Sequence, residues 1–339
     1  MRIGAKRILV LRSHGVGDVL WSTPFLANLR RGYPDARISY LVRQSCAPIM
    51  AGNTDVDELI VFSPRAGALR FLADLRRRRC DLSIDLIGTP RTALQSLACG
   101  APHRIGFDFR MRRHCYNHVL SAAVANRGHE VEFNFHVLDF LGVPVTTRGL
   151  VFNLAPQELE FKQQVWRQLG YGQRDIIVGI LPTGGWACKR WPVANYAALA
   201  ERIAAQQPVK PLVFWGSGQE FADAKMIAAA AGPGVSIVPP TTLRQAAALL
   251  SGCSAVVGND SGPLHIATAF GVPAVAFYGP TNPNSQGPWG TGHTVLRDES
   301  LPCLCCNRME CREPRCMTGI TVDRAWAALD RTLGAMAAR

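Results

Sequence analysis

The chain has 339 residues, of which 48% are hydrophobic and 18% charged, and its formal net charge is +12. This length allows two domains with a core each, and the composition excludes an intrinsically disordered protein. No apolar run is long enough to cross a bilayer, and the first run, residues 8–11, is too short for a signal-peptide core, so we expect a cytoplasmic protein.

The positive charge is concentrated in the first half of the chain. Residues 1–150 contain 21 Lys and Arg against 12 Asp and Glu, a net charge of +9, which leaves +3 for the remainder. A basic half favours an acidic partner, such as a phosphorylated substrate or an anionic lipid surface. Few aromatic residues lie between the basic ones and no nucleic-acid-binding module is visible, so we expect no nucleic-acid partner. The alternative is that the arginines are only a solvated surface.

The first half alternates short apolar runs with helical patterns. Apolar runs that predict buried parallel strands occupy residues 6–11, 38–42, 59–62, 82–86 and 104–107. Segments with helical spacing or composition occupy residues 19–31, 71–79, 91–97 and 130–141.

The turn after the first strand contains Gly15, Val16, Gly17 and Asp18. It lacks the third glycine of a dinucleotide-binding turn, and no acidic residue that could hold a ribose ends the second strand, which argues against NAD. Arg43, at the end of the second strand, leaves NADP as an alternative. Two interpretations of the role of Asp18 remain open. It either caps the helix, or it accepts a proton from a substrate that approaches the glycine backbone.

A connection over residues 151–175 is expected to join two domains, 1–150 and 176–339. It holds a predicted strand at 150–154 and a helix at 156–169. Strands are then predicted at 176–181, 211–215, 236–238, 255–258 and 274–278, and helices at 191–206, 221–231, 243–250 and 264–270. This alternation predicts an α/β protein with two doubly wound, Rossmann-like domains that face each other across a cleft, with ligands at the carboxyl ends of the strands.

The sequence GNDSGPLHIATAFGVP, from Gly258 to Pro273, reads as strand, polar turn and helix. Asn259, Asp260 and Ser261 are all residues that favour the N-cap of a helix, and Pro263 suits its first turn. Such a turn presents backbone N–H groups and the positive end of a helix dipole, which suits a phosphate. A capped helix without a ligand is the alternative.

Two further turns of the second half carry charged residues. Lys189 and Arg190 precede a predicted helix, where cations oppose the helix dipole unless an anion binds between them. Glu220, after a strand and a glycine turn, either stabilises the first turn of its helix or accepts hydrogen bonds from a ribose. In the first half, Arg91 is the arginine that we expect to contact a phosphate.

Four cysteines near the carboxyl terminus follow the spacing C-x2-C-x4-C-x4-C: Cys303, Cys306, Cys311 and Cys316. Four thiolates at short spacing can bind Zn or Fe, although this spacing is not a common zinc-finger pattern. A reduced, Cys-rich loop is the alternative.

These segments together resemble glycosyltransferase family 9, the ADP-heptose:lipopolysaccharide heptosyltransferases, over nearly the whole chain. The matching segments are RSHGVGDVLWSTPFLANLR, DLSIDLIGTPRTA, GHEVEFNF, CKRWPVANYAALA, WGSGQE, GNDSGPLHIATAFGVPAVAFYGPTNP and the terminal CM-x2-I. Their order and spacing carry the resemblance, since no single segment would.

The resemblance implies a GT-B fold and an inverting transfer of heptose from ADP-heptose to the lipopolysaccharide inner core, without a catalytic metal. It implies that Asp18 is the catalytic base and that Lys189 neutralises the diphosphate. It further implies a set of donor-site residues: Thr183, Lys189, Glu220, Asp260, Ser261, Gly262 and His265. The acceptor is expected at Gly15, Gly17 and Arg91, with the enzyme held near the anionic face of the inner membrane.

Two departures from the family pattern keep alternatives open. Gly184, Gly185 and Trp186 stand where relatives often have Ser or Thr, and the cysteine cluster occurs in only part of the family. The alternatives are a heptosyltransferase with a protein (autotransporter) acceptor, another sugar-nucleotide enzyme such as an epimerase, or a non-catalytic nucleotide-sugar-binding protein.

Overall fold

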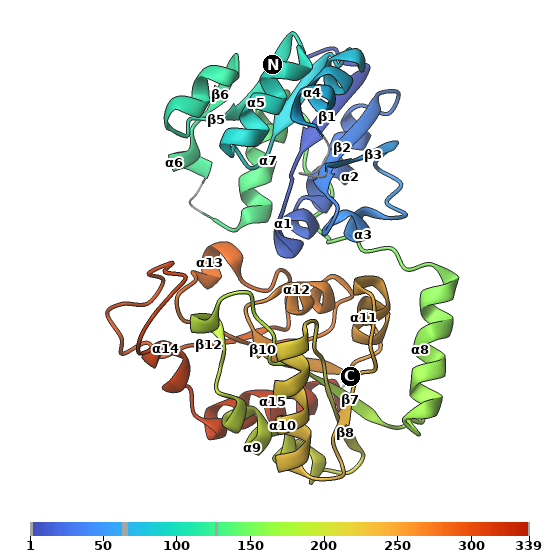
Figure 1. The fold of residues 1–339 in the computed structure, drawn as a ribbon, viewed down its shortest axis with the longest axis vertical. Coiled ribbons are helices and arrows are strands. Elements are labelled where there is room, and N and C mark those ends of the chain that lie inside the picture. Colours follow the sequence, from blue (N-terminus) through green and yellow to red (C-terminus); the bar gives the residue numbers. More distant parts are fainter. Residues whose placement is uncertain (1–2, 63–66, 126–127, 338–339) are drawn as a thin grey trace. The chain divides into compact units, whose positions relative to one another are not determined.

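The computed structural model describes residues 3–62, 67–125 and 128–337. The chain divides between Asn153 and Leu154 into two compact units. Each unit is built on a parallel sheet, with six strands among the described residues. Figure 1 shows strands and surrounding helices in both units. The predicted α/β class is therefore confirmed.

The sheet of the first unit has the strand order β3-β2-β1-β4-β5-β6. The order reverses at β1, so the loops at the carboxyl ends of β1 and β4 diverge there, which is where doubly wound sheets bind ligands. Its strands are β1 (Arg7–Leu11), β2 (Arg37–Arg43), β3 (Glu58–Phe62), β4 (Leu82–Asp85), β5 (His103–Phe107) and β6 (His118–Leu120).

The helices of the first unit include one break that the sequence analysis missed. The helix expected over residues 19–31 is two helices, because the Ser22 hydroxyl bonds the carbonyl of Val19 (2.7 Å) and Pro24 has no N–H to continue the ladder. The helices are α1 (Val16–Trp21), α2 (Thr23–Gly32), α3 (Ala47–Met50), α4 (Ala68–Arg77), α5 (Pro90–Cys99), the 3-10 helix η1 (Arg110–Cys115), α6 (Ala122–Ala125) and α7 (Glu130–Leu141).

The segment before the second unit is extended but is not a strand. The predicted strand at 150–154 is wrong, because these residues belong to neither sheet. The N–H of Val151 donates to the Thr23 hydroxyl (2.9 Å), and Phe152 is buried. An apolar extended segment therefore need not belong to a sheet.

The sheet of the second unit has the order β12-β11-β10-β7-β8-β9, with the reversal between β10 and β7. Its strands are β7 (Ile176–Leu181), β8 (Val209–Val213), β9 (Ser236–Ile237), β10 (Ala255–Asn259), β11 (Ala274–Phe277) and β12 (Thr294–Leu296). Its helices are α8 (Pro156–Gln168), the 3-10 helix η2 (Ala187–Lys189), α9 (Val193–Ala204), α10 (Gly218–Ala231), α11 (Leu243–Leu250), α12 (Gly262–Ala269), α13 (Pro283–Gln286), α14 (Arg315–Thr318) and α15 (Val322–Ala337).

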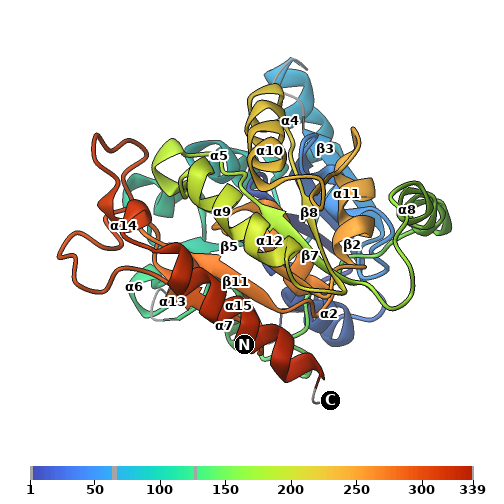
Figure 2. The ribbon, with the colours of Figure 1, turned by 90° about the horizontal axis from the view of Figure 1, so that it is seen from below.

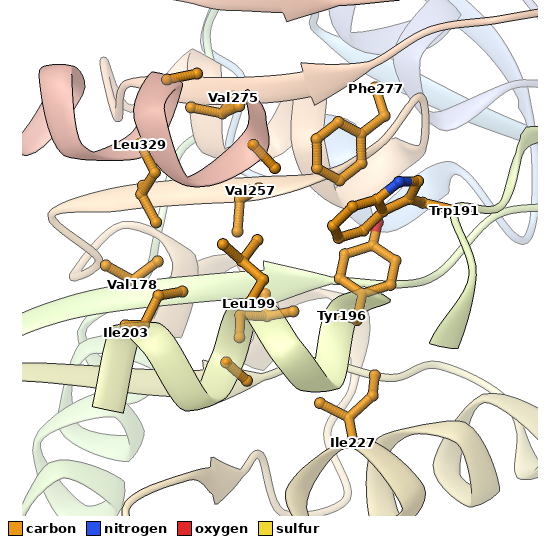
Figure 3. Packing of buried hydrophobic residues seen from close by; sticks show 14 of the residues in the cluster. Val178, Trp191, Tyr196, Leu199, Ile203, Ile227, Val257, Val275, Phe277 and Leu329 are labelled. Atoms are coloured by element: carbon orange, nitrogen blue, oxygen red, sulfur yellow. The ribbon is translucent and has the colours of Figure 1, made fainter. Parts of the chain in front are cut away.

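The main core of the second unit lies between the sheet and the helices α9, α10 and α15. Figure 2 shows α9 and α15 on the same side of the sheet. Trp191 is at one end of this core, with its ring centroid 4.6 Å from that of Phe277 and 4.9 Å from that of Tyr196 (Figure 3). Its indole N–H donates to the carbonyl of Ile320 (2.7 Å), so the buried donor is satisfied. This packing fixes the start of α9, directly after the Lys189–Arg190 turn.

Gly258 in β10 is required by close packing against β7. A Cβ at this position would lie 2.5 Å from both the Cβ and the carbonyl oxygen of Leu181. Backbone atoms cannot move aside as a flexible side chain can, so a larger residue must displace one of the two central strands. Because β10 leads directly into the turn before α12, this displacement would reach the candidate site.

We expect Gly258→Ala to lower the free energy of unfolding by about 1–3 kcal/mol, because overpacking strains the central strands. Urea unfolding measures the effect. Gly218→Ala, at the start of α10, is the matched control, since a Cβ there meets no atom within 4 Å. Equal stabilities of the two variants would contradict the packing argument.

Candidate functional site

Asp260, in the turn after β10, is a buried carboxylate surrounded by donors. It accepts from the Lys189 ammonium and the Thr281 hydroxyl at 2.7 Å each, and it contacts His265 Nε2 and the Tyr278 hydroxyl at 3.3 Å each. Burial works to raise its pKa, but the hydrogen bond and charge of His265 and the charge of Lys189 hold it well below its usual range. Asp260 is therefore ionised and fixes the positions of several neighbouring side chains.

Lys189 reaches Asp260 from η2, on the neighbouring turn after β7. Its ammonium lies 4.2 Å from the centroid of the Trp186 ring, and its side chain is largely buried. A carboxylate and an aromatic face together hold the charge in one place. A cation near the start of a helix is repelled by the helix dipole. The ion pair between Lys189 and Asp260 offsets this repulsion.

Ser261 is the N-cap residue of α12, whereas Asn259 and Asp260 are not. The Ser261 side chain makes no capping hydrogen bond to the helix, and it receives a long hydrogen bond (3.4 Å) from the Thr183 hydroxyl. Gly262 is the first residue of α12. The Thr183 hydroxyl therefore lies beside the N-cap residue of α12, and Ser261 does not form the side-chain cap that the sequence predicted.

A cavity of about 510 Å³ opens next to this turn, at the carboxyl ends of β7 and β8. This volume is in the range of small-molecule sites, and the walls combine apolar groups with a few charged ones. It is lined by Thr183, Gly184, Gly185, Arg190, Phe214, Trp215, Gly216, Ser217, Glu220, Thr241, Thr242, Leu243, Ala246, Leu250, Pro263 and Ile266. Of the expected donor-site residues, Thr183 and Glu220 line it, and α12 contributes Pro263 and Ile266.

Glu220 joins the two loops that form the mouth of this cavity. Its carboxylate accepts from the N–H of Gly216 (3.0 Å) and from the N–H of Gly184 (3.3 Å), and Arg190 lies 3.9 Å away. Each carboxylate oxygen can accept a second hydrogen bond, so these contacts leave room for a ligand hydroxyl. Arg190 is a positively charged residue in the lining of the cavity. The sequence predicted Lys189, and not Arg190, as a residue of the donor site.

In the first unit, Asp18 is paired with a buried arginine. One Arg12 nitrogen donates to Asp18 (2.6 Å) and to Glu130 (3.1 Å), and another donates to the carbonyl of Leu86 (2.5 Å). Burial lowers the pKa of Arg12, but the two carboxylates more than offset this, so the guanidinium stays charged. The N-cap residue of α1 is Gly15, and Asp18 lies in the first turn of the helix.

The glycine turn lets the Asp18 carboxylate fold back against the backbone. Gly15 has φ of +88°, and a Cβ there would lie 1.8 Å from Asp18 Oδ2. Any side chain at Gly15 would therefore displace the carboxylate, besides adopting a strained backbone. Gly17 lies in the first turn of α1, one residue before Asp18.

Basic side chains gather around Asp18. Arg91, in the first turn of α5, lies with its guanidinium carbon 5.2 Å from the centroid of the Phe62 ring. Burial lowers the pKa of His14; the charge of Asp18 opposes this, whereas Arg43 and Arg91 lower it further. Arg43 and Arg91 are thus two cations near His14, and guanidinium groups suit carboxylates and phosphates.

Several residues of the site were not predicted from the sequence. Arg12 directly follows a predicted strand, and Glu130 lies in the quoted segment GHEVEFNF, so both stood in plausible places. Thr281 and Tyr278 follow β11, whose carboxyl end adjoins that of β10 in the parallel sheet. Only the tertiary structure shows that they share one carboxylate.

The cysteine cluster does not form a ready metal site. In the described parts of the chain, no group of three or more His, Cys, Asp or Glu side chains is placed to hold a metal ion. Burial raises the pKa of the Cys316 thiol to about 11, and the nearby thiols of Cys303, Cys306 and Cys311 add to this effect. The four sulfur atoms thus lie near one another, but they are not arranged as the ligands of one metal ion.

Comparison with known proteins gives a consistent result. A family model, glycosyltransferase family 9 (heptosyltransferase), matches residues 68–317. Lipopolysaccharide heptosyltransferase 2 of Escherichia coli K12 is 28% identical over 307 residues, which cover 86% of this chain and 88% of that protein.

Two solved structures are similar over nearly the whole chain. The glycosyl transferase family 9 protein of Veillonella parvula has a TM-score of 0.86 at 25% identity and covers 98% of each chain. The E. coli ADP-heptose lps heptosyltransferase II has a TM-score of 0.79 at 25% identity and covers 97% of this chain and 99% of that one.

The Asp260 network makes a pH-dependent contribution to stability. Because the folded-state pKa of Asp260 is depressed, the carboxylate stabilises the fold at pH values above its ordinary pKa of 3.8, and this contribution is lost as the pH falls towards the folded-state value. We expect Asp260→Asn to cost about 3 kcal/mol at pH 7, the usual effect of removing one partner of a buried ion pair. The difference from the wild type should shrink below pH 3.8.

Urea unfolding at several pH values measures this difference. Asp323→Asn is the control, because the Asp323 side chain is 81% exposed and pairs with Arg202 on the surface, so it should cost little at any pH. A constant difference between wild type and Asp260→Asn from pH 7 down to pH 3 would contradict the assignment.

Proposed function

The chain belongs to glycosyltransferase family 9, and we propose that it transfers heptose from ADP-heptose to the inner core of lipopolysaccharide. It is a glycosyltransferase with the GT-B fold of its structural neighbours. The observation that carries the proposal is the similarity to a lipopolysaccharide heptosyltransferase over 86% of the chain. The contacts of the site residues indicate a role for each of them in this reaction.

The nucleotide occupies the cavity of the second unit. Adenine and ribose fit the walls formed by the loops after β7 and β8, where Glu220 accepts from a ribose hydroxyl. The diphosphate lies at the start of α12, near Thr183, Ser261 and Gly262, because the open N–H groups of a helix N-terminus bind anions.

Lys189 stabilises the diphosphate as it leaves. Asp260 holds the ammonium at 2.7 Å, and His265 contacts the same carboxylate. A cation that is already in place when the leaving group gains charge loses little free energy to reorganisation. Arg190 adds a second positive charge at the cavity wall.

Asp18 acts as the base that removes the proton of the acceptor hydroxyl. The carboxylate is held by Arg12, and Glu130 shares the positive charge of that arginine. A positioned base of this kind contributes about 10²–10⁴-fold to the rate.

The acceptor binds at the Gly15–Gly17 turn, with anionic groups on Arg91 and Arg43. The inner core of lipopolysaccharide carries carboxylates and phosphates, which suit bidentate guanidinium contacts. We also propose that the enzyme works in peripheral contact with the anionic face of the membrane that holds this acceptor.

Asp18→Asn should abolish transfer and leave ADP affinity nearly unchanged, because Asp18 lies in the first unit and the nucleotide cavity in the second. ADP release in the presence of ADP-heptose and a heptose-deficient core lipid measures transfer, and calorimetry measures ADP binding. Lys189→Ala is the comparison variant, expected to weaken ADP binding and lower turnover together.

The outcomes separate the possible activities. ADP release that requires the core lipid supports the proposal, and release without any acceptor would identify a hydrolase or epimerase. If Asp18→Asn weakened ADP binding as much as Lys189→Ala does, the role given to Asp18 would be wrong.

A structural Zn or Fe ion bound by Cys303, Cys306, Cys311 and Cys316 is a separate proposal, supported by the four thiols that interact in one segment. Because these thiols do not form a cage, binding would require the segment to rearrange. Elemental analysis of freshly purified protein tests it. We expect close to one metal ion per chain, lost in Cys303→Ser/Cys306→Ser, and a metal-free wild-type protein would contradict it.

A further inference from the structure

Exposed apolar side chains gather on three neighbouring elements of the first unit. Leu69 on α4 is 85% exposed, Met111 on η1 is 77% exposed, and Leu94 and Leu97 on α5 are 57% and 44% exposed. Single exposed apolar residues are normal on protein surfaces, whereas a group of them on adjacent elements marks an interaction site.

The elements that carry these side chains are neighbours, because α4 and η1 both pack against α5. On α5, Arg91, Leu94 and Leu97 follow one another at intervals of three, so they form a stripe along the helix. α4 packs beside α5 (Figure 1), and Arg76 reaches the end of α5, where a Cβ on Gly100 would lie 2.4 Å from its guanidinium. η1 packs against α5 as well. We call this surface the α4–α5 face; its apolar residues are Leu69, Leu94, Leu97 and Met111.

Arginines surround the apolar residues of the α4–α5 face. Asp74 is the one acidic residue of α4 and α5, and it pairs with Arg77 at 2.6 Å. The face therefore carries a clear excess of positive charge, from Arg70, Arg76, Arg77, Arg91, Arg110, Arg112 and Arg113.

We propose that the α4–α5 face docks on an anionic phospholipid surface. Aliphatic side chains enter the boundary between head groups and acyl chains, while the arginines contact lipid phosphates. Leucine and methionine offer no planar face for stacking on bases, which makes single-stranded nucleic acid a poor fit. Among the described residues, none of the helices has the length and hydrophobicity of a membrane-spanning segment.

The face is continuous with the neighbourhood of Asp18. Arg91 begins the α5 stripe, and α5 follows β4, whose carboxyl end adjoins that of β1 in the parallel sheet. Asp18 lies in α1, the helix that follows β1. This inference rests on the proposed function: an acceptor with a lipid anchor would place its sugars near Asp18 and its anchor along the stripe. Docking would therefore hold the first unit against the surface in which its acceptor is embedded.

Vesicle sedimentation with the full-length protein tests the proposal. The vesicles contain phosphatidylethanolamine and phosphatidylglycerol in equal parts, and vesicles of phosphatidylcholine alone give the neutral comparison. We expect binding to the anionic vesicles that weakens with added salt, and little binding to the neutral ones.

Two variants separate the apolar and the charged contributions. Leu69→Ser/Leu94→Ser/Met111→Ser and Arg70→Gln/Arg76→Gln/Arg113→Gln should each weaken binding at least tenfold, since each arginine near an anionic surface is worth about fivefold. The control variant Met226→Ser/Arg174→Gln removes exposed residues from the second unit, and it should bind as the wild type does. Thermal unfolding verifies that all variants are folded.

Two results would overturn the proposal. In one, both face variants bind anionic vesicles as tightly as the control. In the other, the serine variant changes the oligomeric state in size-exclusion chromatography but not vesicle binding, which would make the face a contact between copies of the chain.

Turnover with two acceptors distinguishes this inference from the proposed function. The face variants should transfer to a lipid-free core oligosaccharide at the wild-type rate and lose at least tenfold on the same core embedded in vesicles. If no acceptor supported ADP release, the proposed function would fail, and vesicle sedimentation would still decide whether the face binds lipid.

Discussion

The second unit depends on two polar residues that stand side by side at the end of β10. Asn259 is fully buried; its oxygen accepts from the N–H of Trp191 (2.9 Å) and the Tyr196 hydroxyl (2.8 Å), and its nitrogen donates to the carbonyls of Pro182 (3.0 Å) and Thr183 (3.2 Å). One amide thus ties β10, the loop after β7 and the start of α9 together. Since a buried amide without these bonds would be costly, the arrangement is strongly specified. Asp260, the next residue, then has Lys189 within reach because Asn259 has fixed the chain around it.

The sequence predicted regular elements well where local signals and tertiary structure agree. The helices at 130–141 and 243–250 have the predicted bounds, since both combine an apolar pattern with clear ends. The turn before α12 is different. Asn259, Asp260 and Ser261 all favour N-caps, yet only Ser261 occupies that position. N-cap propensity cannot distinguish a polar residue that caps a helix from one whose side chain bonds to neighbouring strands and loops. Residues of both kinds occur between the end of a strand and the start of the next helix.

The contacts of Asp18 lay outside what a single sequence can predict. The two carboxylates that share Arg12 are separated by more than a hundred residues, and nothing local to either one indicates the pair. Gly15 was a better signal, because a glycine in the turn before a carboxylate suggests a close approach, and the space that it leaves is filled by Asp18 itself. In both units, therefore, a carboxylate after a strand is held by a cation. This cation is Arg12 in the first unit and Lys189 in the second. Their neighbours differ, since Glu130 is a second carboxylate on Arg12, whereas Asp260 is a single carboxylate with several donors.

The excess positive charge of the first unit has at least two different uses. Some arginines hold the fold: Arg12 joins the turn after β1 to α7, and Arg30 bonds the carbonyl of Ala36 (2.6 Å) and the carboxylate of Asp57. Such residues are at least partly buried and would be present whatever the protein bound. The arginines of the α4–α5 face differ, because most are exposed and stand among exposed aliphatic side chains. Exposed leucine and methionine side chains gain free energy when they are removed from water. The proposed layer of anionic lipid would cover the aliphatic and the charged side chains of this face at the same time.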